Sequence, residues 1–96
     1  MKQPPSTPDP SQAPRLEYPL AYGFTIIGLA GDDFPEHARR LVARHVAEVP
    51  VEAVIVRASA GGKYHSVSVS VLLDSEEQRR AVYRSLHDDA RVVFVL

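Results

Sequence analysis

The chain of 96 residues has no cysteine, no tryptophan and a formal net charge of only −1. The absence of cysteine excludes a disulfide scaffold, a thiolate metal site and a cysteine nucleophile. The isoelectric point of about 6.4 argues against bulk electrostatic binding of nucleic acid, which usually needs a strongly basic domain. No apolar run approaches the roughly 18 residues of a membrane-spanning helix, so we expect no membrane partner.

The first residues are poor in apolar side chains and rich in proline. Each proline removes an amide donor and biases its predecessor towards extended backbone. Six of the eight prolines fall in this region: Pro4, Pro5, Pro8, Pro10, Pro14 and Pro19. We therefore expect residues 1–15 to be a disordered tail and residues 16–96 to form one domain. Residues 1–5 lack the hydrophobic core of a secretory signal, so a cytoplasmic location is the expectation.

The first half of the domain predicts a strand followed by a helix. Residues 24–29 (FTIIGL) are short, apolar and partly β-branched, which is typical of a buried strand. Asp33 is followed three residues later by Glu36, a spacing that resembles a capping box at a helix start. Apolar residues then recur at helical spacing, so we expect an amphipathic helix of about four turns that closes before Pro50.

The second half predicts a hairpin, another helix and a final strand. Residues 51–59 are strand-like, and residues 60–62 (AGG) favour a tight turn because glycine tolerates a positive φ. Ser75 and Gln78 stand at capping-box spacing before a helix that ends near residues 87–89. The β-branched residues 91–96 form the last predicted strand.

The strand after the turn has the clearest pattern in the chain. A period of two places one set of side chains on each face of a strand. His65, Val67, Val69, Val71 and Leu73 form one set, and Tyr64, Ser66, Ser68, Ser70 and Leu72 form the other. We expect the valine face to be buried and the serine face to be largely polar, as in an antiparallel sheet that is covered on one side.

The element order is therefore β-α-β-β-α-β. This order predicts an α+β ferredoxin-like plait, a four-stranded antiparallel sheet with two helices on one face. The first and third strands are expected to lie at the centre. An uncovered sheet face also predicts self-association, a homo-oligomer formed through the open face or an edge strand.

The run of residues 62–69 (GKYHSVSV) resembles the signature hairpin of the YbeD-like family of small bacterial proteins of unknown function. Further agreement comes from Tyr18-Pro19, Ile26-Ile27-Gly28, Glu77-Gln78, Val82-Tyr83 and Val95-Leu96. The resemblance covers residues 16–96. It implies a plait similar to ACT regulatory domains and a lipoate-related regulatory role.

The chain departs from the family in three places. Thr25 and Val93 stand where relatives often have a basic residue, and Ala60-Gly61 replaces a usual Ser-Lys pair. An anion site that used those basic groups in relatives would be incomplete here.

The candidate ligand site lies at the start of the patterned strand. Lys63 would attract an anion, Tyr64 would stack or donate a hydrogen bond, and His65 and Ser66 adjoin them. The alternative is structural: Tyr64 covers the sheet edge, and His65, which shares the valine parity, satisfies a carbonyl on the covered face. No metal site and no cofactor are expected, because His37 and His45 are separated by about 12 Å of helical rise.

Two arginine clusters also have two interpretations. The first predicted helix carries Arg39, Arg40 and Arg44. The second carries three arginines at the same spacing, Arg79, Arg80 and Arg84. These side chains could bind a phosphate or an acidic partner. The simpler interpretation is a solvated helix surface that is balanced by neighbouring glutamates.

Several functions remain open at this point. The leading hypothesis is a non-enzymatic regulatory or small-ligand-sensing module, and the alternative is a protein–protein interaction or adaptor domain. RNA binding is less favoured, because base stacking needs several aromatic residues on the open face and the patterned strand offers only Tyr64. An acylphosphatase-like mechanism holds phosphate and water with an arginine and an asparagine, and the chain contains no asparagine.

Overall fold

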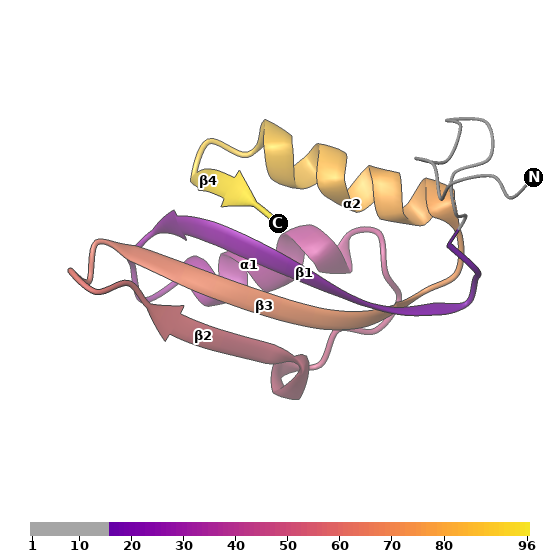
Figure 1. Ribbon diagram of the computed structural model, residues 1–96, viewed down its shortest axis with the longest axis horizontal. Coiled ribbons are helices and arrows are strands. Elements are labelled where there is room, and N and C mark those ends of the chain that lie inside the picture. The colour runs from indigo at the N-terminus through magenta and orange to yellow at the C-terminus, as the bar shows by residue number, and fades with distance from the viewer. Residues whose placement is uncertain (1–15) are drawn as a thin grey trace, which may run out of the picture.

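The computed structural model describes residues 16–96, so the predicted tail of residues 1–15 lies outside the described part of the chain. The sheet contains β1 (Leu20–Leu29), β2 (Val54–Ala58), β3 (Tyr64–Leu73) and β4 (Val92–Val95) in the spatial order β2-β3-β1-β4 (Figure 1). All neighbouring strands are antiparallel. The ferredoxin-like order and the central position of the first and third strands are confirmed.

The two central strands carry most of the sheet. β1 and β3 are each ten residues long and pair along their whole length, from Leu20 opposite Leu73 to Leu29 opposite Tyr64. The prediction that the first strand begins at residue 24 was therefore too short. Residues 20–23 include Ala21 and Gly23, which have low strand propensity alone and are held by pairing with β3.

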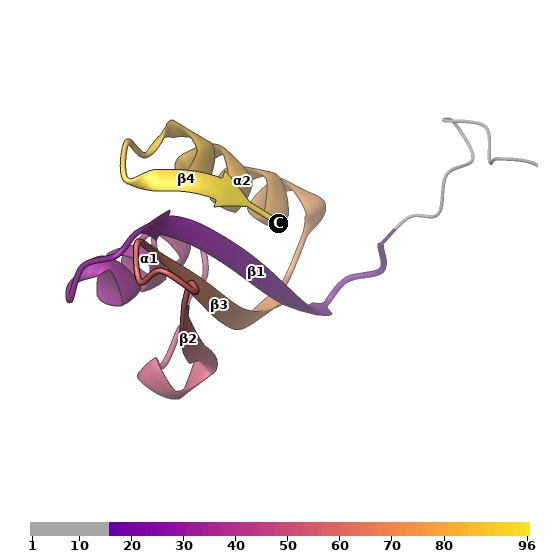
Figure 2. The ribbon, with the colours of Figure 1, turned by 60° about the vertical axis from the view of Figure 1, so that its left-hand side comes forward.

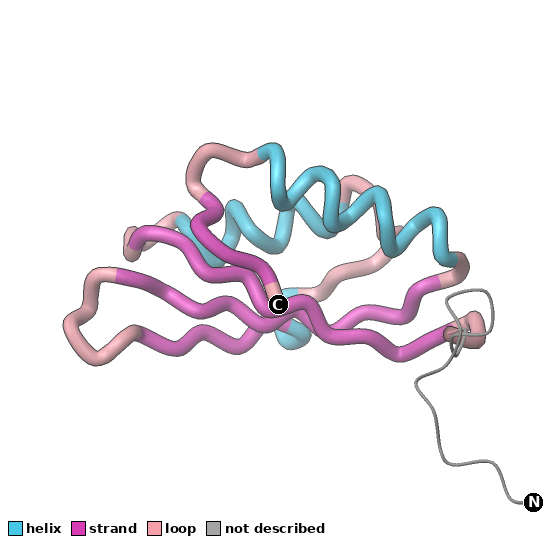
Figure 3. Tube along the Cα trace, turned by 45° about the horizontal axis from the view of Figure 1, so that its top comes forward, coloured by secondary structure: helices cyan, strands magenta, loops and turns pink. Residues whose placement is uncertain are grey.

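Both helices lie on one side of this sheet (Figure 3). α1 (Phe34–Ala43) and α2 (Glu76–Asp88) cover a core in which Phe24, Phe34 and Leu86 are fully buried. The valine face of β3 belongs to the same core, with Val67 and Val69 at 0% exposure. The alternation predicted for this strand is confirmed.

The first helix is shorter than its apolar spacing predicts. α1 ends at Ala43 instead of running for about four turns, because His45 N–H donates to Val42 at 3.0 Å and tightens the last turn. Val46 and Val49 remain buried beyond the helix. Their helical spacing therefore reflects burial of an irregular segment, which periodicity alone does not distinguish from a helix.

The segment predicted as one strand at residues 51–59 is divided. Val51–Ala53 forms a short 3-10 helix, η2, and only Val54–Ala58 forms β2. Ala53 N–H donates to Pro50 at 3.0 Å, so the first part of this segment bonds to itself instead of to β3.

The two predicted capping motifs differ in outcome. Ser75 accepts a hydrogen bond from the Gln78 N–H at 3.1 Å, which confirms the cap of α2. Asp33 makes no side-chain cap on α1. Its carboxylate instead accepts two hydrogen bonds from Arg91, at 2.8 and 3.0 Å. This bidentate, charged pair is stronger than the single hydrogen bond that a backbone N–H would donate to the cap.

The hairpin that joins β2 to β3 follows the glycine prediction. Gly62 adopts φ +72°, and its N–H donates to Ser59 at 2.9 Å. Ser59 N–H in turn donates to Tyr64 at 2.8 Å and closes the hairpin. This turn brings Lys63 to the end of the sheet where β3 begins.

Candidate functional site

The predicted ligand-site residues lie together along the chain but on two faces of the sheet. Tyr64 and Ser66 share the open face, and Lys63 Nζ lies 5.5 Å from the centre of the Tyr64 ring. His65 points to the opposite, helix-facing side because neighbouring residues of a strand alternate. The structure therefore brings Lys63 and Tyr64 together, places Ser66 on the same face as Tyr64, and puts His65 on the other face.

His65 has an unusual environment at the end of the covered face. It lies opposite Gly28 of β1 and Ala58 of β2. Its Nδ1 atom is buried and has no hydrogen-bond partner among residues 16–96. We expected His65 to bond to a nearby carbonyl, but its Nδ1 atom makes no such bond.

A groove with a volume of about 250 Å³ lies between α1 and β2. Its apolar part comes from Pro35 of α1 and from three valines on the other side, and its charged part comes from α1 and from Asp32 just before it. The lining residues are Asp32, Pro35, Glu36, Arg39, Val51, Val54 and Val56. The helix side of β2 is only partly covered at this point: Val56 is 43% exposed, although it pairs with the buried Val67 and so points to the helix side of the sheet.

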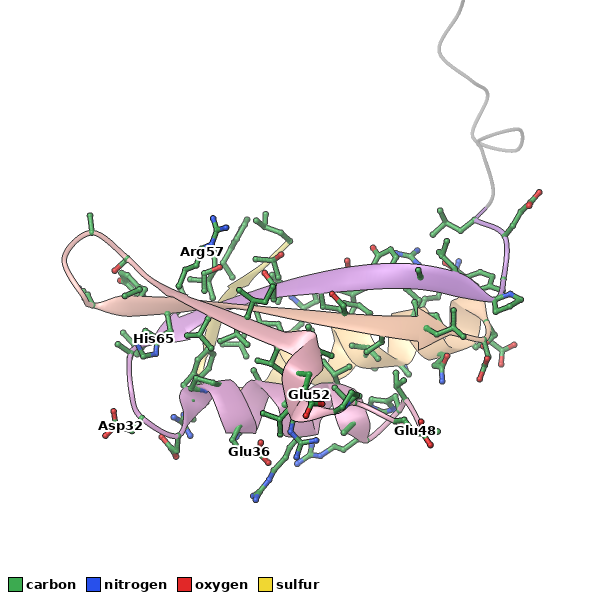
Figure 4. All side chains as sticks on the ribbon, turned by 90° about the horizontal axis from the view of Figure 1, so that it is seen from below. Asp32, Glu36, Glu48, Glu52, Arg57 and His65 are labelled. Carbon is green, nitrogen blue, oxygen red and sulfur yellow. The ribbon has the colours of Figure 1, made fainter. Side chains whose placement is uncertain are left out.

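The charged wall of the groove is an ion pair that is fixed in place. Arg39 donates two hydrogen bonds to Glu36, at 2.6 and 2.7 Å, and a third to the Val49 carbonyl at 2.8 Å. Hydrogen bonds from Arg39 are the main reason why the pKa of Glu36 falls to about 2. Asp32 stands apart at the other end of the groove and is exposed to solvent (Figure 4).

The open face is less polar than the serine pattern predicts. Across the sheet, Ser68 of β3 is flanked by Ile55 and Thr25, and Leu96 pairs with Thr25 beyond β4. Ile55 and Leu96 are 60% and 61% exposed, and Phe94 of β4 is 56% exposed. The prediction of a largely polar face was wrong because β2 and β4 contribute apolar side chains that the pattern of β3 does not contain.

Four of the six arginines in the two clusters are ion-paired on the helix surfaces. Glu36 binds Arg39 and Arg40, and Glu76 binds Arg79 and Arg80 in the same i, i+3 and i, i+4 arrangement. This geometry agrees with the interpretation of a balanced helix surface.

Arg79 also takes part in an aromatic cluster. Its guanidinium lies 5.8 and 5.6 Å from the rings of Tyr22 and Tyr83, whose hydroxyls are 2.7 Å apart. Burial is the main reason why the pKa of Tyr83 rises to about 12. The cluster ties α2 to β1.

The described residues contain neither a cluster of metal ligands nor a helix that could span a membrane. No group of three or more His, Asp or Glu residues in the range 16–96 has the geometry to hold a metal ion. No helix in the same range is long and apolar enough to cross a membrane.

Sequence reasoning missed the groove. The signal that could have pointed to it is the apolar character of Val54 and Val56 together with Val51, in a strand that also carries Ile55 on its other side. The depth of the groove, however, depends on the distance between α1 and β2, which no residue pattern reports.

These observations define a class: a ferredoxin-like α+β domain with an uncovered sheet face and a small groove beside an edge strand. The family model described as "Protein of unknown function (DUF493)" matches residues 13–96, and the chain belongs to that family. Curated relatives are UPF0250 proteins, which agrees with the YbeD-like resemblance. The function of the family is unknown.

Two relatives and one solved structure illustrate the extent of the match. A UPF0250 protein of Hahella chejuensis is 33% identical over 94% of this chain and 99% of its own length. A UPF0250 protein of Pseudomonas aeruginosa is 34% identical over 94% and 97% of the two chains. The solution structure of protein HP0495 from H. pylori superposes with a TM-score of 0.68 at 20% identity, over 97% and 98% of the two chains, and supports the fold.

Proposed function

We propose that the protein is a non-catalytic regulatory module that senses a small ligand in the groove between α1 and β2. The observation that carries this proposal is a hollow with an apolar floor of three valines and a proline beside one ordered ion pair. Small-molecule sites usually combine such an apolar lining with a few placed polar groups.

The electrostatics of the groove favour binding over catalysis. A general base works best when its pKa lies near the working pH. The pKa of Glu36 is about 2, so at neutral pH this carboxylate is a poor proton acceptor. Its pairing with Arg39 makes the two side chains a fixed dipole that can orient a polar group of a ligand.

The chemistry of the lining selects the kind of ligand. The valines suit a short aliphatic chain, and Arg39 has N–H groups beyond the three that already donate. A small amphipathic molecule with an acidic or polar end fits this arrangement. The resemblance to lipoate-related proteins places lipoate first among the molecules to test, followed by amino acids and nucleotides.

The test is a thermal-shift screen of these molecules, followed by calorimetric titration of any that stabilise the protein. A ligand that binds only the folded state must raise the melting temperature. Val51→Lys places a charge in the groove at a residue that is already 70% exposed, and Val93→Lys is its control on β4, where the valine is 56% exposed. We expect a ligand to stabilise the wild type and Val93→Lys but not Val51→Lys. A screen in which no molecule shifts the melting temperature would contradict the proposal.

The second candidate is a protein-binding adaptor that uses the open sheet face. The exposed Ile55, Phe94 and Leu96 favour it, since apolar side chains clustered on an uncovered face often mark an interaction surface. In this case Phe94→Lys abolishes partner binding, whereas Val51→Lys leaves it intact.

A further inference from the structure

Strand β2 is the border of the sheet that the helices leave unprotected (Figure 2). It exposes apolar side chains on both of its faces: Ile55 is 60% exposed on the open side and Val56 is 43% exposed on the helix side. The other border differs, because Val92 and Val95 of β4 pack against the core. Edge strands usually carry charges, prolines or covers that prevent pairing, and β2 has one charged residue, Arg57.

The main chain of β2 also has free hydrogen-bonding groups. Ser59 bonds to Tyr64 across the hairpin, and the antiparallel ladder alternates from that point, so Ile55 and Arg57 bond towards β3. The N–H and C=O groups of Val56 and Ala58 therefore point away from the sheet. Among residues 16–96, β2 is the last strand of the sheet on this side, and η2 lies next to its first residue (Figure 1).

We propose that this border pairs with the β2 strand of a second copy of the chain, antiparallel, about a twofold axis at Val56. Val56 is the midpoint of Val54–Ala58, so this register pairs all five residues of each strand. An axis at Arg57 would instead bring two guanidinium groups face to face, and like charges directly opposite each other are destabilising.

The chosen register is self-complementary in its side chains. On the helix side Val56 meets the partner's Val56, and on the open side Ile55 meets the aliphatic stem of the partner's Arg57. Figure 4 shows Arg57 projecting from the sheet on the side away from α1, where Ile55 also lies. A surface that matches itself in this way is what a twofold homodimer requires, whereas an unrelated partner would have no reason to share the register.

The main-chain bonds can be counted from the structure. The two Val56 residues exchange a pair, and each Ala58 N–H donates to the Val54 carbonyl of the other copy. The Val54 N–H is already bonded to Val51, so the ladder contains about four bonds. These bonds join the two sheets into one and cover the apolar border.

The absence of cysteine makes a clean cross-linking experiment available. A Val56→Cys variant places two thiols opposite each other across the axis, at the Cα separation of about 5.5 Å that a disulfide accepts. Phe94→Cys is the matched control, since Phe94 is also exposed but lies on β4, the border strand opposite β2. Under mild oxidation we expect Val56→Cys to become a covalent dimer rapidly, and Phe94→Cys to remain largely monomeric.

Light scattering of the protein without ligand supplies the second readout. The wild type should have the mass of a dimer, and Val56→Lys should be monomeric with unchanged circular dichroism. Leu72→Lys changes an apolar residue with 58% exposure on the open face, away from β2, and should stay dimeric. The proposal would be overturned by a monomeric wild type or by equal cross-linking of the two cysteine variants. Dissociation by Leu72→Lys would also overturn it and would assign the interface to the open face. Because no ligand is added, the result is independent of the groove's function.

Discussion

Gly28 lies where the first strand passes the tip of a buried aromatic ring. A methyl group at this position would come within 2.2 Å of Phe34 Cζ and 2.7 Å of the Arg91 carbonyl oxygen. The ring is at 0% exposure and the carbonyl is main chain, so neither side yields easily. Overpacking a well-filled core typically costs about 1–3 kcal/mol, and we expect Gly28→Ala to reduce the free energy of unfolding by about 2–3 kcal/mol.

The assay is urea unfolding followed by far-ultraviolet circular dichroism, because the chain has no tryptophan to report by fluorescence. Gly23→Ala on the same strand is the control: no atom lies within 4 Å of its added methyl group, so we expect a change of no more than about 0.5 kcal/mol. In a Phe34→Leu background the ring tip is gone, so Gly28→Ala should cost less than in the wild type. Equal stability of Gly28→Ala and the wild type would refute the steric argument.

Three other predictions concern α2 and its contacts. Hydrogen bonds from Arg79 are the main reason why the pKa of Glu76 falls to about 2, below its ordinary value of 4.5. This carboxylate therefore stabilises the fold above pH 4.5 and loses that effect as the pH falls towards 2. The free energy of unfolding of Glu76→Gln should accordingly fall less than that of the wild type over this pH range in acid denaturation. An unchanged pH dependence would count against the pairing. Ser75→Ala removes the bond to the Gln78 N–H and should cost about 1 kcal/mol in urea unfolding. Tyr83→Phe removes the hydroxyl pair with Tyr22 and should cost about 0.5–1.5 kcal/mol, and it should delete the tyrosine that ionises near pH 12 in an ultraviolet titration.

The parts of the fold that were predictable are those where a local rule and the final contacts agree. The alternation of Val67 and Val69 with serines identifies a half-covered strand, and the strand is half-covered. Ser75 caps a helix with atoms three residues away, so no distant group is needed. Asp33 shows the opposite case, because its expected local role was displaced by Arg91, a partner 58 residues along the chain.

The sequence predicted the ligand-site residues at the start of β3 but not the groove between α1 and β2. The pattern placed Tyr64 and Ser66 on one face and His65 on the other, and the register of β3 agrees. The same pattern gave no sign of the groove, since its walls come from α1 and from a strand that follows a short 3-10 helix. The apolar character of the open face was missed for the same reason: Ile55 and Phe94 come from the two border strands.

Periods of two and of about 3.6 residues, together with glycine and serine at turns and caps, were sufficient for the element order, and the element order implied the layered plait. These signals act between residues that are close along the chain, where the backbone geometry is fixed by bonding. The groove, the contact between Gly28 and Phe34, and the exposed border at β2 depend on how far separate elements lie from one another. That distance is set by the packing of many side chains at once, and it was decided only in the tertiary structure.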